Sequence, residues 1–358
     1  MMQKRTQYTL EITDIRAVRF GFLLFCGLIL SLAPHRAEAQ GIEAWDIGFT
    51  AGMSNYMGDI GDGRVSRRDF VWDLQELRSR PAFSFFVRRQ LDRDGLWNAR
   101  VDLSRIHIAG HDKSTDYAPR RARNLNFRNH MQEASIRIER DLFQTPLVWG
   151  RQRRAMMTVR AFLGLARLQH NPEGQVDLDN PAFASLAEAG ITSAGEWHSL
   201  PELQTEGHDY TDELNLTTVP FGFAAVITGQ KRGGAPDWYL GVELGFRLTN
   251  TDYLDDISTF YADPSEMSAL GAALSAQSNE GLLEEIGPDA GSMTAHSYIG
   301  DDIPVIRGNP VNNDAYGTFV VSFGKVLERG NGGFNRNRSR YGNKRRGSPF
   351  KRRTRARF

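Results

Sequence analysis

The chain has 358 residues, of which 40% are apolar and 24% charged, a composition that excludes a wholly disordered protein and allows one sizeable folded domain. Its formal net charge of +1 conceals a strong polarity along the chain. Residues 327–358 hold 12 Lys or Arg and one acid, a net charge of +11, and residues 1–39 have a net charge of +2. Subtracting both from the total leaves −12 for residues 40–326, so an acidic body precedes a strongly basic tail.

Residues 1–39 have the pattern of a secretory signal peptide. Arg16 and Arg19 precede an apolar run over residues 20–33, and Ala37 to Ala39 provide a small-x-small cleavage pattern. The run has the length of a signal segment and is too short to cross a bilayer comfortably as a helix. We therefore expect residues 1–39 to be removed on export, with a retained anchor as the alternative.

The single cysteine, Cys26, lies inside this apolar run, so the mature chain is expected to contain no thiol. Disulfides and thiolate metal sites are thereby excluded, and nothing in the sequence indicates a cofactor or a metal site. After residue 39 there is no apolar run of about 18 residues, which excludes helical membrane spans. If the mature chain enters a membrane, it must do so as a closed β-barrel.

Large apolar residues alternate with small or polar ones in several segments, as they do in strands with one lipid-facing and one polar side. Residues 45–53 and 238–249 are the clearest examples. The pattern predicts an all-β fold: an eight-stranded antiparallel transmembrane β-barrel of the outer-membrane type, occupying residues 40–326. The expected strands are residues 43–53, 81–89, 96–106, 125–140, 155–168, 213–228, 237–248 and 314–326.

The expected connections alternate in length, since the second, fourth and sixth are short and the others are long. Small outer-membrane barrels show this alternation because their periplasmic turns are short and their external loops long. Trp45, Trp97 and Trp238 each stand at the start of an odd-numbered strand, which predicts an aromatic girdle at one membrane interface. Pro220 cannot donate a hydrogen bond within the sixth strand, and we expect a β-bulge there.

Charged side chains fall on the predicted inward faces, four of each sign. They are Arg100, Asp102, Glu133, Arg137, Glu139, Arg160, Glu243 and Arg247. An eight-stranded barrel is just wide enough to be filled by side chains, and guanidinium–carboxylate pairs satisfy buried charges, so we interpret these residues as structural ion pairs. This interpretation argues against a conducting pore and against an enzyme, and no catalytic residue is predicted.

Two other groups of residues are candidates for a function. His107, His130 and His170 lie near predicted external strand ends, which leaves an outer-leaflet lipid hydrolase as an alternative, although no nucleophile motif of the G-x-S-x-G kind accompanies them. The segment 248–306 contains no Lys or Arg and is rich in Asp and Glu. Because its spacing differs from that of an EF-hand loop, we interpret it as a solvated acidic surface. A surface adhesin that uses these long loops is a further alternative.

The basic tail over residues 327–358 has few apolar residues and is predicted to be a flexible polycation in the periplasm. Export argues against nucleic acid as its partner, and acidic protein surfaces or anionic head groups are the expected counterparts. The candidate partner-binding residues are Arg345, Arg346, Lys351, Arg352 and Arg353.

Several stretches, taken in order, resemble the PorG-like outer-membrane barrels of the type IX secretion system. They are Trp45–Gly48, Tyr56–Ile60, Arg123–Phe127, His170–Pro172, Leu203–Gly207, Thr251–Ser258, Arg307–Pro310 and Asn312–Asp314, followed by the basic tail that ends in Phe358. The resemblance covers nearly the whole expected mature chain. An Ala-rich segment at residues 182–195 and the basic residues within 231–234 depart from it.

The resemblance implies a role in protein secretion rather than catalysis. Members of this family associate with a periplasmic ring, formed by a lipoprotein and its partner, and help to tether that ring to the outer membrane. For this chain the resemblance therefore implies the ring lipoprotein, its partner and outer-membrane lipid as binding partners.

Overall fold

The structure is a computed structural model that describes residues 44–60, 79–92, 95–115, 117–149, 153–176, 181–230, 236–278, 280–287, 306–308 and 313–328. The expected signal peptide and the candidate tail residues Arg345, Arg346, Lys351, Arg352 and Arg353 lie outside the described residues. Eight long strands dominate the described part. They are β1 (Ala44–Met57), β2 (Arg80–Gln90), β3 (Trp97–His111), β4 (Asn126–Trp149), β5 (Arg153–Gln169), β8 (Asn215–Gln230), β9 (Pro236–Leu248) and β10 (Ala315–Glu328).

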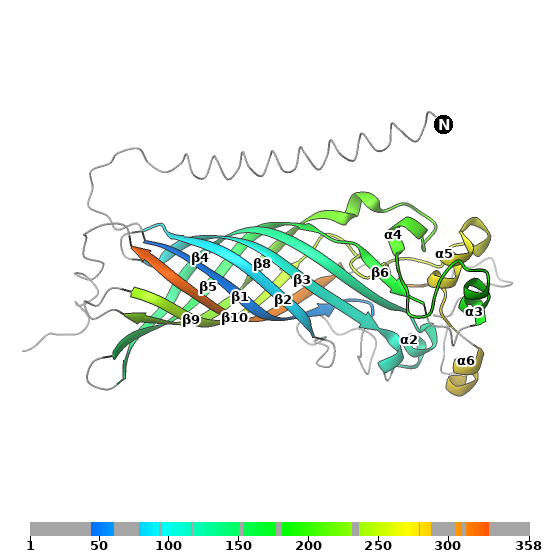
Figure 1. Cartoon of the computed structure of the whole chain (residues 1–358), viewed down its shortest axis with the longest axis horizontal. Coiled ribbons are helices and arrows are strands. Elements are labelled where there is room, and N and C mark those ends of the chain that lie inside the picture. Colours follow the sequence, from blue (N-terminus) through cyan, green and yellow to red (C-terminus); the bar gives the residue numbers. More distant parts are fainter. Residues whose placement is uncertain are drawn as a thin grey trace, which may run out of the picture. The chain divides into compact units, whose positions relative to one another are not determined.

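These eight strands form a closed antiparallel barrel. The hydrogen-bonded order is β3-β2-β1-β10-β9-β8-β5-β4, and β3 also pairs with β4, from Trp97 opposite Arg140 to His111 opposite Asn126. This last ladder closes the sheet, so no long strand is left with an unpaired edge. The strands run obliquely across the barrel, as Figure 1 shows. The predicted eight-stranded transmembrane barrel of the outer-membrane type is confirmed.

The connections between barrel strands alternate in length, as the sequence predicted. Those from β1 to β2, β3 to β4, β5 to β8 and β9 to β10 have 22, 14, 45 and 66 residues, whereas the other three have 6, 3 and 5. Antiparallel strands place all the long connections at one end of the barrel and all the short ones at the other. We refer to these as the long-loop end and the short-turn end.

The long connections carry short elements of their own. β6 (Pro172–Gln175) pairs with β4, and β7 (Trp197–Ser199) pairs with β6. Helices α3 to α6 gather beyond the long-loop end in Figure 1. The remaining elements are η3 (Asp112–Ser114), α2 (Ala118–Arg123), α3 (Pro181–Glu188), α4 (Leu200–Leu203), η4 (Thr211–Leu214), η5 (Pro264–Glu266), α5 (Ala269–Ser275) and α6 (Glu280–Ile286).

The Ala-rich segment 182–195 forms part of a small apolar core outside the barrel. Phe183 of α3 is fully buried and packs in one cluster with Leu200 of α4 and Leu274 of α5. Among the helices that the structure describes, none has the length and hydropathy required to span a bilayer.

The outer surface of the barrel is apolar. On every long strand the large apolar side chains alternate with buried residues, and Leu163, Phe83 and Phe319 are 60%, 54% and 50% exposed. In water such a continuous apolar surface would be unfavourable, whereas in lipid it is the surface that a transmembrane barrel requires.

Tryptophans mark the short-turn end of this apolar belt. Trp97 begins β3 and Trp238 lies near the start of β9, and both side chains are exposed. The Arg140 guanidinium lies 4.7 Å from the centre of the Trp97 ring, and that of Arg89 lies 5.2 Å from the Trp45 ring. This arrangement is the predicted girdle, in which an aromatic ring faces the membrane interface beside a basic group.

Strand boundaries and one irregularity differ from the sequence predictions. β4 continues nine residues beyond residue 140, and its pairing with β5 contains a bulge between Asp141 and Phe143. The bulge predicted at Pro220 is wrong. The pairing of β8 with β5 is interrupted between Phe221 and Thr218, and the register is the same on both sides of the interruption. Because proline only removes a donor, the ladder can skip this position without an inserted residue.

The apolar belt generates a stability prediction. Replacing Leu163 by Arg places a charge on the lipid face of β5 and should destabilise the barrel by about 2–4 kcal/mol in lipid vesicles. Thr217→Arg, an outward substitution at the long-loop end of β8, is the matched control and should cost about 0–1 kcal/mol, since the penalty falls toward the membrane interface. Denaturant titrations of vesicle-inserted protein would measure both. Equal midpoints for L163R and the unmodified chain would contradict the assignment of this face to lipid.

Candidate functional site

The inside of the barrel is filled by a network of charged side chains. The structure places all eight predicted residues there, and each one is buried and takes part in an ion pair: Arg100, Asp102, Glu133, Arg137, Glu139, Arg160, Glu243 and Arg247. Sequence reasoning missed three further members, Asp46, Arg88 and Asp141. The inward parity of β1 and β2 could have indicated Asp46 and Arg88, whereas Asp141 lies just beyond the predicted end of its strand.

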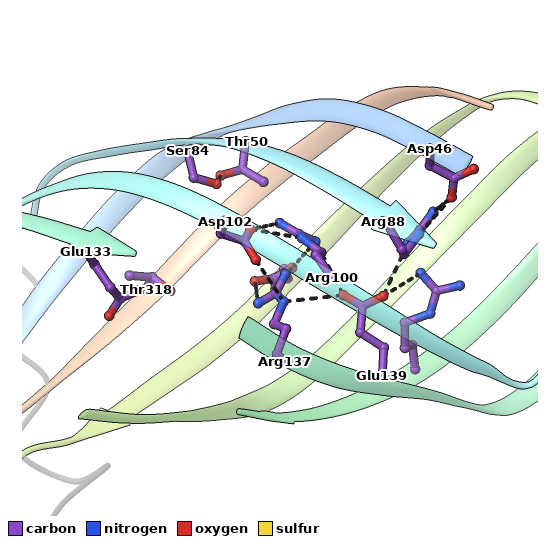
Figure 2. Close-up of polar contacts among 12 residues, drawn as sticks. Asp46, Thr50, Ser84, Arg88, Arg100, Asp102, Glu133, Arg137, Glu139 and Thr318 are labelled. Carbon is purple, nitrogen blue, oxygen red and sulfur yellow. Dashed lines mark hydrogen bonds and ion pairs between the residues drawn. The ribbon is translucent and has the colours of Figure 1, made fainter. Parts of the chain in front are cut away.

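The centre of the network is a bidentate contact across the lumen. Arg137 on β4 donates from Nη1 and Nη2 to the two carboxylate oxygens of Glu243 on β9, at 2.7 and 2.8 Å. Arg100 on β3 donates to the same carboxylate at 3.1 Å. Since β9 is bonded within the sheet only to β8 and β10, these contacts join opposite walls of the barrel. Figure 2 shows Arg100 and Arg137 converging inside the barrel.

A second carboxylate, that of Glu139, extends the network toward the short-turn end. Its Oε2 accepts from Arg160 at 3.2 Å and from Arg88 at 3.4 Å, and both guanidinium groups have a second carboxylate partner. Arg160 donates to Asp141 at 2.6 Å, and Arg88 donates to Asp46 at 2.7 Å. Each buried arginine is thus shared between two carboxylates, which is the arrangement needed to compensate the desolvation of buried charges.

A third group lies nearer the long-loop end. Glu133 accepts a 2.7 Å hydrogen bond from the Tyr316 hydroxyl and a 3.4 Å contact from Arg247. Arg247 also donates to the hydroxyl of Thr318. These contacts connect β4, β9 and β10, so the lumen is cross-linked along most of its length.

The space left within the described lumen is small. A cavity of about 60 Å³ at the short-turn end is lined by Asp46, Arg88, Asn98 and Arg160 among others, and a second of about 20 Å³ lies beside Asp102 and Glu243. The first volume is enough for a few water molecules and the second for about one. The described lumen is therefore a packed polar core and does not have the continuous passage that a solute channel needs.

At the long-loop end the connections form a buried plug, defined here as residues 56–60, 123–127, 203–210, 251–261, 306–308 and 313–314. Leu254, Ile257 and Ile60 are fully buried and belong to the same apolar cluster as Ile106 and Leu216 of the barrel wall. The plug and the part of the lumen at the long-loop end therefore share one apolar core.

Two aspartates and a tyrosine form the polar centre of the plug. The Tyr56 hydroxyl oxygen lies 2.6 Å from Oδ2 of Asp255 and 2.7 Å from Oδ1 of Asp314, and all three residues are buried. A tyrosine hydroxyl has a single proton to donate. One of these two short contacts must therefore be donated by a protonated carboxyl group, so the pair retains a proton.

The surroundings of the pair explain why that proton is held. Burial and the neighbouring Asp59 carboxylate raise the pKa of Asp255 to about 7, and burial together with Asp255 and Asp252 raises the pKa of Asp314 well above its ordinary value. Backbone amides of Ile257 and Leu254 donate to the two carboxyl groups at 3.0 Å each.

Arg123 joins three connections to one another. Its Nε and Nη2 donate to the Asp112 carboxylate at 2.7 and 3.0 Å, while Nη1 and Nη2 donate to the backbone oxygens of Arg307 and Asp59 at 2.7 and 2.9 Å. The guanidinium is completely buried. Burial by itself lowers the pKa of Arg123, whereas the charges around it, that of Asp112 above all, raise the pKa above its ordinary value. A single side chain thus satisfies backbone groups of the β1–β2 and β9–β10 connections.

A second buried arginine completes the plug. Arg307 donates to Asp256 at 3.0 Å and to Glu206 at 3.1 Å, and Asp256 also accepts from the hydroxyls of Thr205 and Tyr210. Asp256 has a left-handed φ of 71°, a backbone conformation that asparagine and aspartate tolerate better than most residues.

The prediction that the segment 248–306 is a solvated acidic surface is wrong for its first part. Asp252, Asp255 and Asp256 are buried in the plug, where Arg307 of the same connection donates to Asp256 and the backbone amide of Ile257 donates to Asp255. Later acids such as Asp263 and Glu266 are exposed, in agreement with the prediction. Within the residues that the structure describes, no group of three or more potential ligands has the geometry of a metal site.

The three histidines considered for hydrolysis do not form one site. His107 and His130 lie opposite each other on the outward faces of β3 and β4, with their Nδ1 atoms 2.9 Å apart. His170 is buried, where burial lowers its pKa to about 4, and it contacts the amide nitrogen of Asn129 and the backbone oxygen of Glu213 at 3.1 and 3.0 Å. Neutral His170 therefore serves as a hydrogen-bonded part of the core.

No known family profile matches the chain, and no curated protein matches it in sequence. Among solved structures it is similar to the attachment invasion locus protein Ail of Yersinia pestis, in complex with the heparin analogue sucrose octasulfate, with 7% identity over 81% of this chain and 100% of that chain and a TM-score of 0.26. Neisserial surface protein A has 8% identity over 79% and 99%, with a TM-score of 0.26. The TodX deltaS2S3 mutant monoaromatic hydrocarbon channel has 13% identity over 62% and 49%, with a TM-score of 0.23.

Removing the central carboxylate of the lumen tests its structural importance. Glu243→Ala leaves the buried Arg137 and Arg100 without their shared partner and should destabilise the barrel by about 3–5 kcal/mol. Asp237→Ala is the matched control, because it breaks an ion pair with Lys325 whose basic side chain is 55% exposed, and it should cost less than about 1 kcal/mol. Denaturant unfolding in lipid vesicles gives both values. Equal losses for the two variants would argue against a cross-linked lumen.

Because the pKa values of Asp255 and Asp314 are raised, we expect the plug to become less stable as pH rises. A carboxyl whose pKa is raised on folding favours the folded state at low pH, and this contribution is lost as pH increases from the ordinary value near 4 through the folded value of about 7 for Asp255. Amide exchange at residues 253–258, corrected for the intrinsic pH dependence, should show less protection at pH 8 than at pH 5.5.

An isosteric variant identifies the group responsible for this pH dependence. Asp255→Asn keeps the shape of the side chain and removes its charge, so the part of the pH dependence that Asp255 causes should be lost, and only a part due to Asp314 should remain. Asp209→Asn, at an exposed position where the Thr211 amide lowers the pKa, is the control and should leave the pH dependence unchanged. An undiminished pH dependence in D255N would show that another group is titrating.

Proposed function

We propose that this chain is a structural component of the outer membrane in a type IX protein secretion machine, where it tethers or stabilises a periplasmic ring made of a lipoprotein and its partner. The observation that carries the proposal is the position of the stretches that resemble the PorG-like barrels. They are scattered from residue 45 to residue 314 in the sequence, yet most of their described residues meet in the plug.

The contacts between these stretches are direct. Tyr56, from the second of the eight stretches, contacts Asp255 from the sixth and Asp314 from the last. Arg123 contacts the backbone of Asp59 and Arg307. Because the stretches at residues 56–60, 123–127, 251–258, 307–310 and 312–314 satisfy one another's buried polar groups, this part of the resemblance describes one folded unit and not a set of independent short motifs. This mutual dependence supports assignment to the family more strongly than any single stretch does.

The filled lumen favours anchoring over transport. A barrel whose opposite walls are joined by buried ion pairs is a rigid body, and its functional surfaces are its two ends and its lipid-facing wall. Ala44 of β1 pairs with Glu328 of β10 at the short-turn end, so both chain termini leave the barrel there. In the proposed orientation this end faces the periplasm, as in other small outer-membrane barrels.

The tail provides a means of binding the ring. The thirty residues after Glu328 contain 12 basic residues and no acidic one, and a polycation of this kind is attracted to acidic protein surfaces over about one Debye length, near 8–10 Å at physiological salt. The residues proposed to bind are Arg345, Arg346, Lys351, Arg352 and Arg353.

A co-purification experiment tests the proposed function. The full chain, affinity-tagged at a long-loop position, would be expressed in a strain with a type IX system whose own copy has been deleted, and purified from solubilised outer membrane. We expect the ring lipoprotein and its partner to co-purify, and secretion of type IX cargo to be restored. A variant with all five tail residues changed to Gln should recover at least several-fold less of the ring at moderate salt.

The outcomes separate the alternatives. Normal cargo secretion without this chain, together with no recovery of ring components, would exclude the proposed function. If long-loop deletions then abolished binding to surface ligands while secretion continued, the chain would be an adhesin. Unchanged ring recovery by the five-residue variant would exclude the tail as the binding element but leave the anchoring role intact.

A further inference from the structure

Basic side chains are concentrated on one sector of the outer wall at the long-loop end. Arg105 on β3, Arg128 on β4 and Arg167 on β5 occupy outward positions in the strand alternation, directly beyond the apolar belt. His107 and His130 lie between them. We refer to these five residues as the basic sector.

The strand register brings Arg105 and Arg167 close together. Arg105 is opposite Gln132, which is opposite Gln169, and Arg167 is two positions from Gln169 on the same face. Neighbouring strands are separated by about 4.8 Å, so β3 and β5 are about 10 Å apart, and residues two positions apart are separated by about 7 Å. Side chains as long as arginine can span such a distance, so Arg105 and Arg167 can contact one polyvalent ligand together. Arg128 lies four positions from Gln132 along β4, about 13 Å toward the long-loop end, with His130 between them.

Of the three arginines, only Arg128 has an ion-pair partner among the described residues. Arg128 lies 4.3 Å above the Trp197 ring and pairs with Glu173, which fixes the position of its guanidinium. Arg105 and Arg167 are exposed, and neither has an ion-pair partner among the residues that the structure describes. The sector therefore has one positioned and two available guanidinium groups, with a net charge of +2 after Glu173 is counted.

The other strands have no equivalent at this end. Outward positions near the long-loop ends of β1, β8, β9 and β10 are uncharged: Met53, Thr217, Leu248 and Gly317. On β2 the outward position is Pro81, and the neighbouring Arg80, at an inward position of the alternation, is exposed at the end of the strand. Charge at the outward positions of this part of the wall is thus confined to β3, β4 and β5. Below it on the same strands lie Leu103, Leu163 and Leu165, which are among the most exposed apolar residues of the barrel.

We propose that the basic sector binds the phosphate groups of an anionic glycolipid in the adjacent membrane leaflet. Guanidinium groups bind phosphate oxygens in a bidentate manner, and the imidazole N–H groups of the histidine pair can donate to the same head group. The apolar residues below are placed to contact the acyl chains. A ligand that is phosphorylated at one end and apolar at the other matches both halves of this surface.

The position of the sector favours a lipid over a soluble protein partner. Its charges begin where the lipid-facing belt ends, and their side chains point away from the plug. Anionic head groups are held at that level by the membrane itself, so a modest intrinsic affinity is sufficient for occupancy. This inference requires only that the barrel is inserted in a membrane and is independent of the proposed role in secretion.

Native mass spectrometry of the full refolded chain in detergent tests the proposal. The probes are a bis-phosphorylated glucosamine disaccharide lipid (lipid A), the same lipid after enzymatic removal of its phosphates, and phosphatidylglycerol. We expect one lipid A molecule to be retained and the dephosphorylated lipid to bind at least tenfold more weakly. The triple variant R105Q/R128Q/R167Q should weaken lipid A binding at least tenfold, whereas R105K/R167K should retain most of it.

Arg89→Gln with Arg140→Gln is the matched control, since it removes two outward arginines from the short-turn end. This variant should bind lipid A as the unmodified chain does. Heat-modifiable gel mobility would verify that each variant folds, and if the triple variant fails to fold, R105Q/R167Q replaces it with the same expectation. Three results would overturn the proposal: unchanged lipid A binding by the triple variant or its replacement R105Q/R167Q, equal weakening by the control, or binding of phosphatidylglycerol equal to that of lipid A.

Discussion

The structure depends on one constraint: charges inside a closed barrel must be satisfied by one another. The bidentate contact between Arg137 and Glu243 meets this requirement across the lumen, and it fixes which faces of β4 and β9 oppose each other. Arg100, Arg88 and Arg160 extend the same arrangement through shared carboxylates. Breaking such a pair leaves a buried unpaired charge. The network therefore fills the lumen and also favours one position of β4 relative to β9, although the two strands are not neighbours in the sheet.

The same constraint shapes the plug, with a different solution. Arg123 and Arg307 neutralise Asp112, Asp256 and Glu206, but Asp255 and Asp314 share a tyrosine and retain a proton. The plug thus contains both fully paired charges and a pair of carboxyl groups whose pKa values are raised, that of Asp255 to about 7. Stability at the long-loop end is therefore coupled to pH, whereas the lumen below it is held by ion pairs.

These features divide the molecule into regions with different roles. The lumen and plug give rigidity, the apolar belt and tryptophan girdle set the depth of insertion, and the functional contacts are left to the ends and the outer wall. The proposed ring anchor uses the short-turn end with its basic tail, and the proposed lipid site uses the opposite rim of the wall.

The sequence by itself determined the number of strands, their alternation and most of the lumen charges, because a period of two is a local property that each strand displays independently. Asp46 and Arg88 also occupy inward positions of this alternation. Asp141 could not be assigned from it, because β4 continues through a bulge beyond the predicted end of the strand. Only the tertiary structure decided which aspartates of the acidic segment after Leu248 are buried and which are exposed. Whether Asp255 is solvated or buried depends on Tyr56, Asp59 and Arg123, which lie more than a hundred residues away, and no local pattern encodes that meeting.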